Sequence, residues 1–326
     1  MPNLETKYLG LTLKNPIIVG SSGLTRSANK IEACEEAGAG AVVIKSLFEE
    51  SLLKEDLGLH DSTMMHTEAY DYLRAQVNLQ YGPQEYCTVI SEAKKRVKIP
   101  VIASINCISP KWWPDFAQKV EAAGADALEL NVFPVVNDTI NSSAVVEQVY
   151  LKILEEVKAK VSLPVAMKIS MYITALPHLA RQLAANGLAG LVMFNRFVEP
   201  DIDIKNLQLK TTFPFSTKDD IHHVLRWVAL LSGRIRCDLS ATSGIHSSEA
   251  IIKLLLAGAS TVQLASVLYK QGFKKINQLL QEIEAWMASH QFEKISEFQG
   301  KLSFANTTSP DVYLRSQFME RVREVE

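Results

Sequence analysis

The chain has 326 residues, of which 47% are hydrophobic and 21% are charged, a composition that excludes disordered and collagen-like proteins. Its formal net charge of -2 argues against a basic face for nucleic acid, although a small anionic substrate needs only local positive charge. The four cysteines lie far apart in the sequence and form no zinc or redox motif, so a reducing, cytoplasmic setting is expected.

The N-terminus lacks the cationic start and apolar stretch of a signal peptide. The most apolar segment, residues 251–269, contains Lys253 and Gln263 and is therefore predicted to be a helix, a turn and a strand. No membrane partner is expected.

Taken in chain order, the sequence begins with an alternating segment, residues 4–13, that predicts a hairpin around Gly10 covering the bottom of the fold. Eight short β-rich apolar runs then alternate with helical stretches, as is typical of parallel βαβ units. Eight such units close most economically into a TIM (β/α)8 barrel, with a doubly wound open sheet as the competing α/β fold. The runs are residues 16–21, 41–45, 100–105, 127–132, 164–169, 191–195, 235–239 and 261–264.

A small-residue turn repeats before three of these strands, around Gly38, Gly124 and Gly258, and favours barrel closure. Glycine supplies the left-handed helix cap there, so this pattern is structural. Residues 201–215 predict a strand-bearing insertion between the sixth and seventh strands. Residues 273–299 predict extra C-terminal helices, and residues 303–326 a charged tail that packs on a neighbour. Without a linker, residues 1–326 are interpreted as one domain.

In a barrel the functional site lies at the C-terminal ends of the strands, so the polar residues that end strands are its candidates. For any single one of them the alternative is a strand end that faces water or makes a local turn. The set comprises Ser21, Ser22, Gly23, Lys45, Ser46, Asn106, Glu129, Asn131, Lys168, Asn195, Thr242, Ser243, Gly244, Ala265 and Ser266.

The loops after the seventh and eighth strands are the usual phosphate site of a barrel, because backbone N–H groups converge there on an anion. Residues 241–245 and 263–266 supply small residues and hydroxyls in both loops. The alternative is a tight turn with a helix cap, which Ser247 and Ser248 favour.

At this point the chain resembles the class 1 dihydroorotate dehydrogenases over nearly its whole length. The matching motifs follow one another in the family's order, and residues 292–302 match its C-terminal segment. The motifs are Lys14-Asn15-Pro16, Ser21-Ser22-Gly23, Val43-Ile44-Lys45-Ser46, Glu129-Leu130-Asn131, Met167-Lys168-Ile169-Ser170, Ser243-Gly244-Ile245 and residues 258–263.

The resemblance implies that FMN lies over the barrel mouth, with its phosphate on Ser243-Gly244 and Ala265-Ser266. It implies Ser21, Ser22, Gly23, Ser46 and Asn106 as further cofactor contacts, and Lys45, Asn131, Lys168 and Asn195 as both cofactor-binding and catalytic residues. Lys168 would lie near the N1–C2=O edge of the flavin, where a cation favours reduction. The alternative for Lys168 is a strand-end lysine paired with a carboxylate. A homodimer and an unidentified electron acceptor are also implied.

The chain departs from the family in the substrate site. The family's general base is a Cys or Ser that follows the Asn of strand four, where this chain has Phe133 or Pro134, and neither accepts a proton. The family's Asn-x-Met-Gly-Leu loop is replaced by residues 75–83, which carry Asn78 and Gln80. Other candidates for the base are Cys107, Asn137, Thr139, Ser142 and Ser143, and the alternative for Cys107 is inert packing. His222, His223 and His246 could also reach the mouth, although a surface histidine is the favoured interpretation for His222 and His223.

The function expected is therefore an FMN-dependent oxidoreductase that acts on a CH–CH donor such as a dihydropyrimidine, with no metal. One alternative is a flavin-free lyase or isomerase that uses Lys45 or Lys168 as a Schiff-base lysine. Another is an FMN-binding protein without turnover.

Overall fold

The chain forms a closed parallel barrel. The computed structural model describes residues 2–49, 82–107, 112–134, 139–196, 200–211 and 215–314. The barrel strands are β3 (Ile17–Val19), β4 (Ala41–Val43), β6 (Val101–Asn106), β7 (Ala127–Asn131), β8 (Val165–Ile169), β9 (Gly190–Met193), β12 (Asp238–Thr242) and β13 (Thr261–Leu264). They pair in the order β4-β3-β13-β12-β9-β8-β7-β6, and pairing of β4 with β6 closes the ring. The short β5 (Leu47–Phe48) extends the ring by pairing with β6. The predicted (β/α)8 barrel is confirmed.

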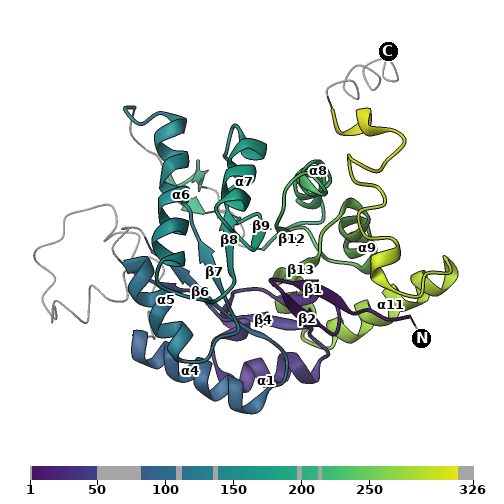
Figure 1. Cartoon of the computed structure of the whole chain (residues 1–326), viewed down its shortest axis with the longest axis horizontal. Helices are drawn as coiled ribbons and strands as arrows, with labels where there is room; N and C mark the ends of the chain where they lie inside the picture. Colours follow the sequence, from purple (N-terminus) through teal and green to yellow (C-terminus); the bar gives the residue numbers. More distant parts are fainter. Residues whose placement is uncertain are drawn as a thin grey trace, which may run out of the picture.

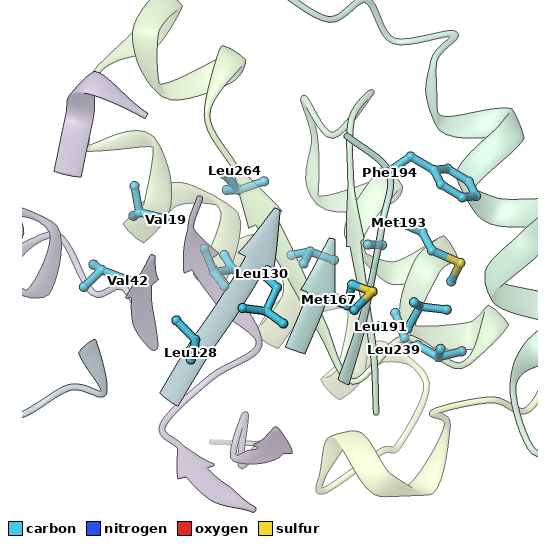
Figure 2. Close-up of a cluster of buried hydrophobic side chains, with 14 of the residues drawn as sticks. Val19, Val42, Leu128, Leu130, Met167, Leu191, Met193, Phe194, Leu239 and Leu264 are labelled. Atoms are coloured by element: carbon cyan, nitrogen blue, oxygen red, sulfur yellow. The ribbon is translucent and has the colours of Figure 1, made fainter. Parts of the chain in front are cut away.

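Helices surround the barrel (Figure 1). They are α1 (Ala28–Glu36), α4 (Pro83–Arg96), α5 (Trp112–Ala122), α6 (Ser143–Lys158), α7 (Leu176–Ala185), α8 (Ile221–Leu231), α9 (Ser248–Ala257), α10 (Ser266–Gln271) and α11 (Lys275–Ser289). Their apolar faces repeat at helical spacing, as α8 does when it buries Ile221, Val224 and Val228. Alternate residues of the strands pack outward beneath them, and Figure 2 shows part of this apolar layer.

The repeated small-residue turns have the predicted conformation. Gly38, Gly124 and Gly258 have φ of 95°, 92° and 114°, the left-handed region that favours glycine. Ser247 caps α9 by accepting a hydrogen bond from the Ala250 amide at 3.3 Å. The helix, turn and strand predicted for residues 251–269 are therefore confirmed.

The predicted N-terminal hairpin is formed by β1 (Thr6–Tyr8) and β2 (Leu11–Leu13). Its apolar side chains Tyr8, Leu9 and Leu13 join the barrel interior, where they pack with strand residues such as Ile18 and Val192. The Leu9 amide donates to Asp238 Oδ2 at 2.7 Å, and Thr6 Oγ1 donates to the Ser260 carbonyl at 3.0 Å. Both partners lie where β12 and β13 begin, so the hairpin seals the bottom of the barrel.

The seventh strand begins later than predicted. The sequence favours residues 235–239, whereas β12 runs from Asp238 to Thr242. Ile235 and Cys237 instead pack against the core from the turn that follows α8. Asp238 is the first strand residue, where it pairs with Gly190 of β9 and its carboxylate anchors the hairpin. The prediction of the strand's start was therefore wrong by three positions.

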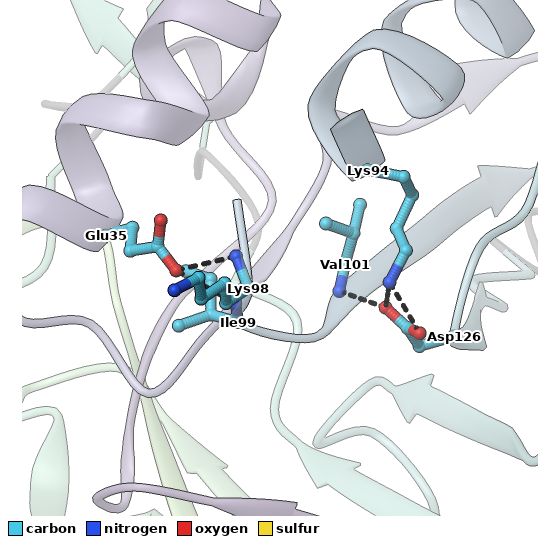
Figure 3. A network of polar contacts seen from close by, with 6 residues as sticks. All are labelled: Glu35, Lys94, Lys98, Ile99, Val101 and Asp126. Carbon is cyan, nitrogen blue, oxygen red and sulfur yellow. Dashed lines mark hydrogen bonds and ion pairs between the residues drawn. The ribbon is translucent and has the colours of Figure 1, made fainter. Parts of the chain in front are cut away.

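A polar network fixes the start of β6 at the same end of the barrel (Figure 3). Asp126 accepts from the Val101 amide at 2.7 Å and pairs with Lys94 at 2.7 Å. Glu35 accepts from the amides of Lys98 and Ile99 at 2.7 and 3.0 Å. Carboxylates therefore satisfy the backbone of the connection that enters the strand.

Two additions to the barrel appear where the sequence predicts them. The insertion forms the hairpin β10 (Pro200–Asp203) and β11 (Gln208–Thr211). The C-terminal additions are α11 with two short 3-10 helices, η2 (Ile295–Glu297) and η3 (Pro310–Tyr313). The first part of the predicted tail, residues 303–314, packs on the chain itself, where the Phe304 amide donates to the Ala229 carbonyl at 3.0 Å. Residues 315–326 lie outside the described residues. Among the described helices, none is long and apolar enough to cross a membrane.

Candidate functional site

The candidate residues lie around one end of the barrel. Parallel strands end on the same side, so Asn106, Asn131 and Thr242, which end β6, β7 and β12, share that mouth. Lys168 is the fourth residue of β8 and pairs in register with Asn131. The loops that follow the other strands carry the remaining members at the same end: Ser21, Ser22, Gly23, Lys45, Ser46, Asn195, Ser243, Gly244, Ala265 and Ser266.

A chain of hydroxyls joins three strand ends. Ser21 Oγ lies 3.0 Å from Ser46 Oγ and accepts from the Ser46 amide at 2.8 Å. Ser46 Oγ lies 2.8 Å from Ser104 Oγ, and Ser104 is fully buried. Tyr86 holds Ser104 by donating to its carbonyl and accepting from its amide. The half-buried Lys45 precedes Ser46, so its backbone is fixed from below.

The loop after β3 rests against the helix after β13. Ser22 caps the short helix η1 (Gly23–Thr25) by accepting from the Leu24 amide at 3.3 Å. Gly23 accepts from Lys30 Nζ at 2.8 Å, and a Cβ at Gly23 would lie 2.7 Å from the Tyr269 hydroxyl. A side chain at position 23 would therefore displace the Tyr269 hydroxyl, so the loop after β3 and helix α10 pack closely here.

Two asparagines meet at the mouth. Asn195 Nδ2 donates to Asn131 Oδ1 at 2.9 Å, and both side chains are half-buried. The pairing leaves Asn131 with an N–H donor and Asn195 with a carbonyl acceptor directed elsewhere. Such a pair can bind a planar ring whose edge carries both donors and acceptors.

A buried carboxylate lies in the barrel interior below Lys168. Glu129 is 1% exposed and accepts from Gln263 Nε2 at 2.7 Å. Burial raises the pKa of Glu129, and the positive charge of Lys168 opposes that rise. The ion pairs found among the described residues do not include Lys168, so this attraction acts without direct contact. The carboxylate partner foreseen as the alternative for Lys168 is thus present nearby but not bonded to it.

The loop after β12 has an unusual backbone. Ser243 and Gly244 have φ of 81° and 74°. A Cβ at Gly244 would overlap the backbone of Asp220 and Ile221 at the start of α8. Gly244 is therefore required both by its conformation and by the close approach of α8.

Ser216, from the segment that precedes α8, joins the loops after β12 and β13. Its amide donates to Ser266 Oγ at 3.0 Å, and its hydroxyl lies 3.1 Å from His246 Nε2. Lys270 Nζ donates to its carbonyl at 3.3 Å. Desolvation lowers the pKa of His246, and the nearby positive charges of Lys270 and Lys218 lower it further. Lys270 therefore brings a positive charge to this corner of the mouth, as an anion site requires.

The candidates for the general base differ in their exposure to solvent. Phe133 and Pro134 follow β7 and are half-buried, Cys107 is 7% exposed, and Thr139 is exposed. Ser142 and Ser143 are exposed at the start of α6, and His222 and His223 are exposed on α8. Asn78, Gln80 and Asn137 lie outside the described residues.

Several residues of the site escaped the sequence-based selection. Ser104 and Gln263 precede Asn106 and Ala265 by two positions, so the alternation of a strand could have placed them on the interior face. Ser216 and Tyr269 carry no such signal, because only the fold brings them to the mouth.

Most of the chain is similar in sequence to known proteins. A family model described as dihydroorotate dehydrogenase matches residues 3–287. The catalytic subunit of dihydroorotate dehydrogenase B (NAD(+)) from Thermoplasma volcanium is 28% identical over 305 residues, 92% of this chain and 98% of the relative. The protein of the same name from Methanocaldococcus jannaschii is 26% identical, over 87% of this chain and 93% of the relative.

Proposed function

The chain belongs to the dihydroorotate dehydrogenase family, and from this membership we propose that it is an FMN-dependent oxidoreductase whose flavin lies over the barrel mouth. The observation that carries the proposal is the convergence of Lys168, the Asn131–Asn195 pair and the Ser21–Ser46 hydroxyls on one mouth. The whole chain, residues 1–326, is taken as one cytoplasmic FMN-binding unit.

The residues present fit FMN. The ring's pyrimidine edge alternates donors and acceptors, which the open groups of Asn131 and Asn195 complement. The loops of Ser243-Gly244 and Ala265-Ser266, beside Lys270, offer hydroxyls and positive charge for the phosphate. FMN, when bound, supplies the hydride acceptor.

The protein's own residues would orient the flavin ring and stabilise charge that develops on it. Lys168 holds a positive charge at the end of β8, where it would balance negative charge that accumulates on the ring. Ser21, Ser22, Gly23, Ser46 and Asn106 would contact the ring from the first strands. Lys45 would contact both the flavin and the substrate.

The substrate is proposed to be a small dihydropyrimidine-like molecule, with dihydroorotate as the reference compound. Phe133 and Pro134 provide no base at the end of β7. A missing general base costs about 10²–10⁴ in rate. We therefore expect dihydroorotate itself to be a poor reductant, unless Cys107 or Thr139 serves as the base.

The electron acceptor is proposed to come from outside this chain. The relatives named above are catalytic subunits of NAD(+) enzymes. A second subunit that carries electrons to NAD(+) is therefore one candidate, and a homodimer that reduces a small acceptor is the other. Measurement of the mass of the native complex distinguishes them.

The test is anaerobic flavin reduction. Purified protein is incubated with excess FMN, freed of unbound flavin and mixed with dihydroorotate in a stopped-flow spectrometer. We expect one FMN per chain and slow bleaching. The absence of bound flavin would refute the proposal. Rapid, saturable bleaching would refute the inference that the general base is missing. In the latter case Cys107→Ala and Thr139→Ala identify the base, because its loss abolishes reduction without releasing FMN.

A further inference from the structure

The side chains of Glu129 and Gln263 are hydrogen-bonded to each other in the barrel interior, and each keeps a second, buried oxygen atom. Gln263 Nε2 donates to Glu129 Oε2, but the buried atoms Glu129 Oε1 and Gln263 Oε1 have no hydrogen-bond partner among the residues that the structure describes. A buried polar atom without a hydrogen-bond partner destabilises the folded state. One proton on Glu129 Oε1 would remove both defects, because an acid O–H can donate to the amide oxygen while the amide donates back.

The ionised form of Glu129 depends on Lys168. Among the described residues, the titratable groups that act on the carboxyl are Lys168 on β8, Tyr8 on the hairpin and Tyr86 on α4. Both tyrosines are buried and desolvation raises their pKa values, so they stay neutral and add no negative charge beside the carboxyl. Lys168 is the only one of these groups that can balance a carboxylate. Of these three groups, Lys168 is also the one that lies at the mouth, so its charge acts on any ligand bound there.

We propose that Glu129 is a positioning residue that takes up and releases a proton. When the mouth gains negative charge, Lys168 balances that charge and Glu129 binds a proton that it shares with Gln263. When the mouth carries no negative charge, Lys168 balances the carboxylate and Glu129 releases the proton. Negative charge at the mouth and the proton on Glu129 therefore favour each other, and by linkage each raises the affinity for the other. Glu129 contacts neither substrate nor flavin and acts through Lys168.

In the context of the proposed function, on which this part rests, the negative charge is the one that FMN gains on reduction. A proton taken from solvent onto Glu129 balances it. Electrons come from the substrate, and the proton comes from water, so no further reactant is needed.

The first test uses the protein without flavin. Infrared spectra of the wild type and Glu129→Gln are compared between about pH 5 and 9, a range in which ordinary carboxyls are ionised. A protonated-carboxyl band that Glu129→Gln lacks identifies the residue. In Lys168→Met, the proton affinity of Glu129 should rise about tenfold or more, because an opposite charge at short range has been removed. Asp238→Asn, at a half-buried carboxylate at the other end of the barrel, is the control and should leave the Glu129 band unchanged.

The second test uses the protein loaded with FMN. Proton uptake on photochemical reduction is measured with a pH indicator in weak buffer. The uptake per flavin should fall in Glu129→Gln, by up to one proton, and remain normal in Asp238→Asn. Unchanged uptake in Glu129→Gln, or a band absent at every pH in both wild type and Lys168→Met, would overturn the proposal and indicate a permanently ionised Glu129 bridged by water. Failure to bind FMN would refute the proposed function alone, since the first test needs no flavin.

Discussion

Gly244→Ala tests whether the loop after β12 is as constrained as its geometry indicates. Alanine at φ 74° costs about 1–2 kcal/mol for the left-handed conformation. Its Cβ would also overlap the backbone at the start of α8, and forced overpacking adds about 1–3 kcal/mol. The free energy of unfolding should therefore fall by about 2–5 kcal/mol.

Gly124→Ala separates the two contributions. Gly124 also has a positive φ, 92°, but nothing lies within 4 Å of a Cβ built there. This variant should lose only about 1–2 kcal/mol, from conformation alone. Urea unfolding followed by circular dichroism gives both values, provided the slopes with denaturant match the wild type.

The two variants should also differ in flavin binding. Gly244 lies in the proposed phosphate loop, whereas Gly124 lies in the turn between α5 and β7 at the opposite end of the barrel. Only Gly244→Ala should weaken FMN binding, measured by fluorescence quenching. Equal losses of stability in the two variants would show that α8 moves aside freely and that the contact at Gly244 is not a constraint.

Three further predictions follow from the polar interior. Ser104→Ala should cost about 1–2 kcal/mol of unfolding free energy by removing a buried partner of Ser46, and thermal denaturation that matches the wild type would contradict this. The pKa of Asp238 is raised mainly by desolvation, so wild-type stability should fall as pH rises through its titration, and Asp238→Asn should show a weaker fall in urea unfolding across that range. Lys168→Ala should lower the flavin midpoint potential without loss of helical circular dichroism, and an unchanged potential would mean that this lysine lies away from the ring.

The sequence predicts the barrel well because its signals are local. Strand runs, helix periodicity and the glycine caps at Gly38, Gly124 and Gly258 each depend on neighbouring residues. The start of β12 was misplaced because the apolar Ile235 pattern looks like a strand, while pairing of Asp238 with Gly190 across the fold sets where the strand begins. Local signals cannot encode such a contact.

The candidate site is predictable to a lesser extent. Strand-end residues were identified from position alone, but their partners were not. Ser216 and His246 are 30 positions apart, and the pairing of Glu129 with Gln263 spans 134. Which oxygens remain unsatisfied is a property of the packed interior, and no pattern in the chain reports it.

The N-terminal hairpin has a consequence for how the chain is made. Its anchors are far away in the sequence: Leu9 bonds to a residue 229 positions later and Thr6 to one 254 positions later. During synthesis the hairpin emerges before the barrel strands, and its apolar side chains have no barrel to enter until β12 and β13 have left the ribosome. Contacts of such long range slow folding. Nascent chains that stop before Asp238 should therefore expose Tyr8 and Leu13 and depend on chaperones.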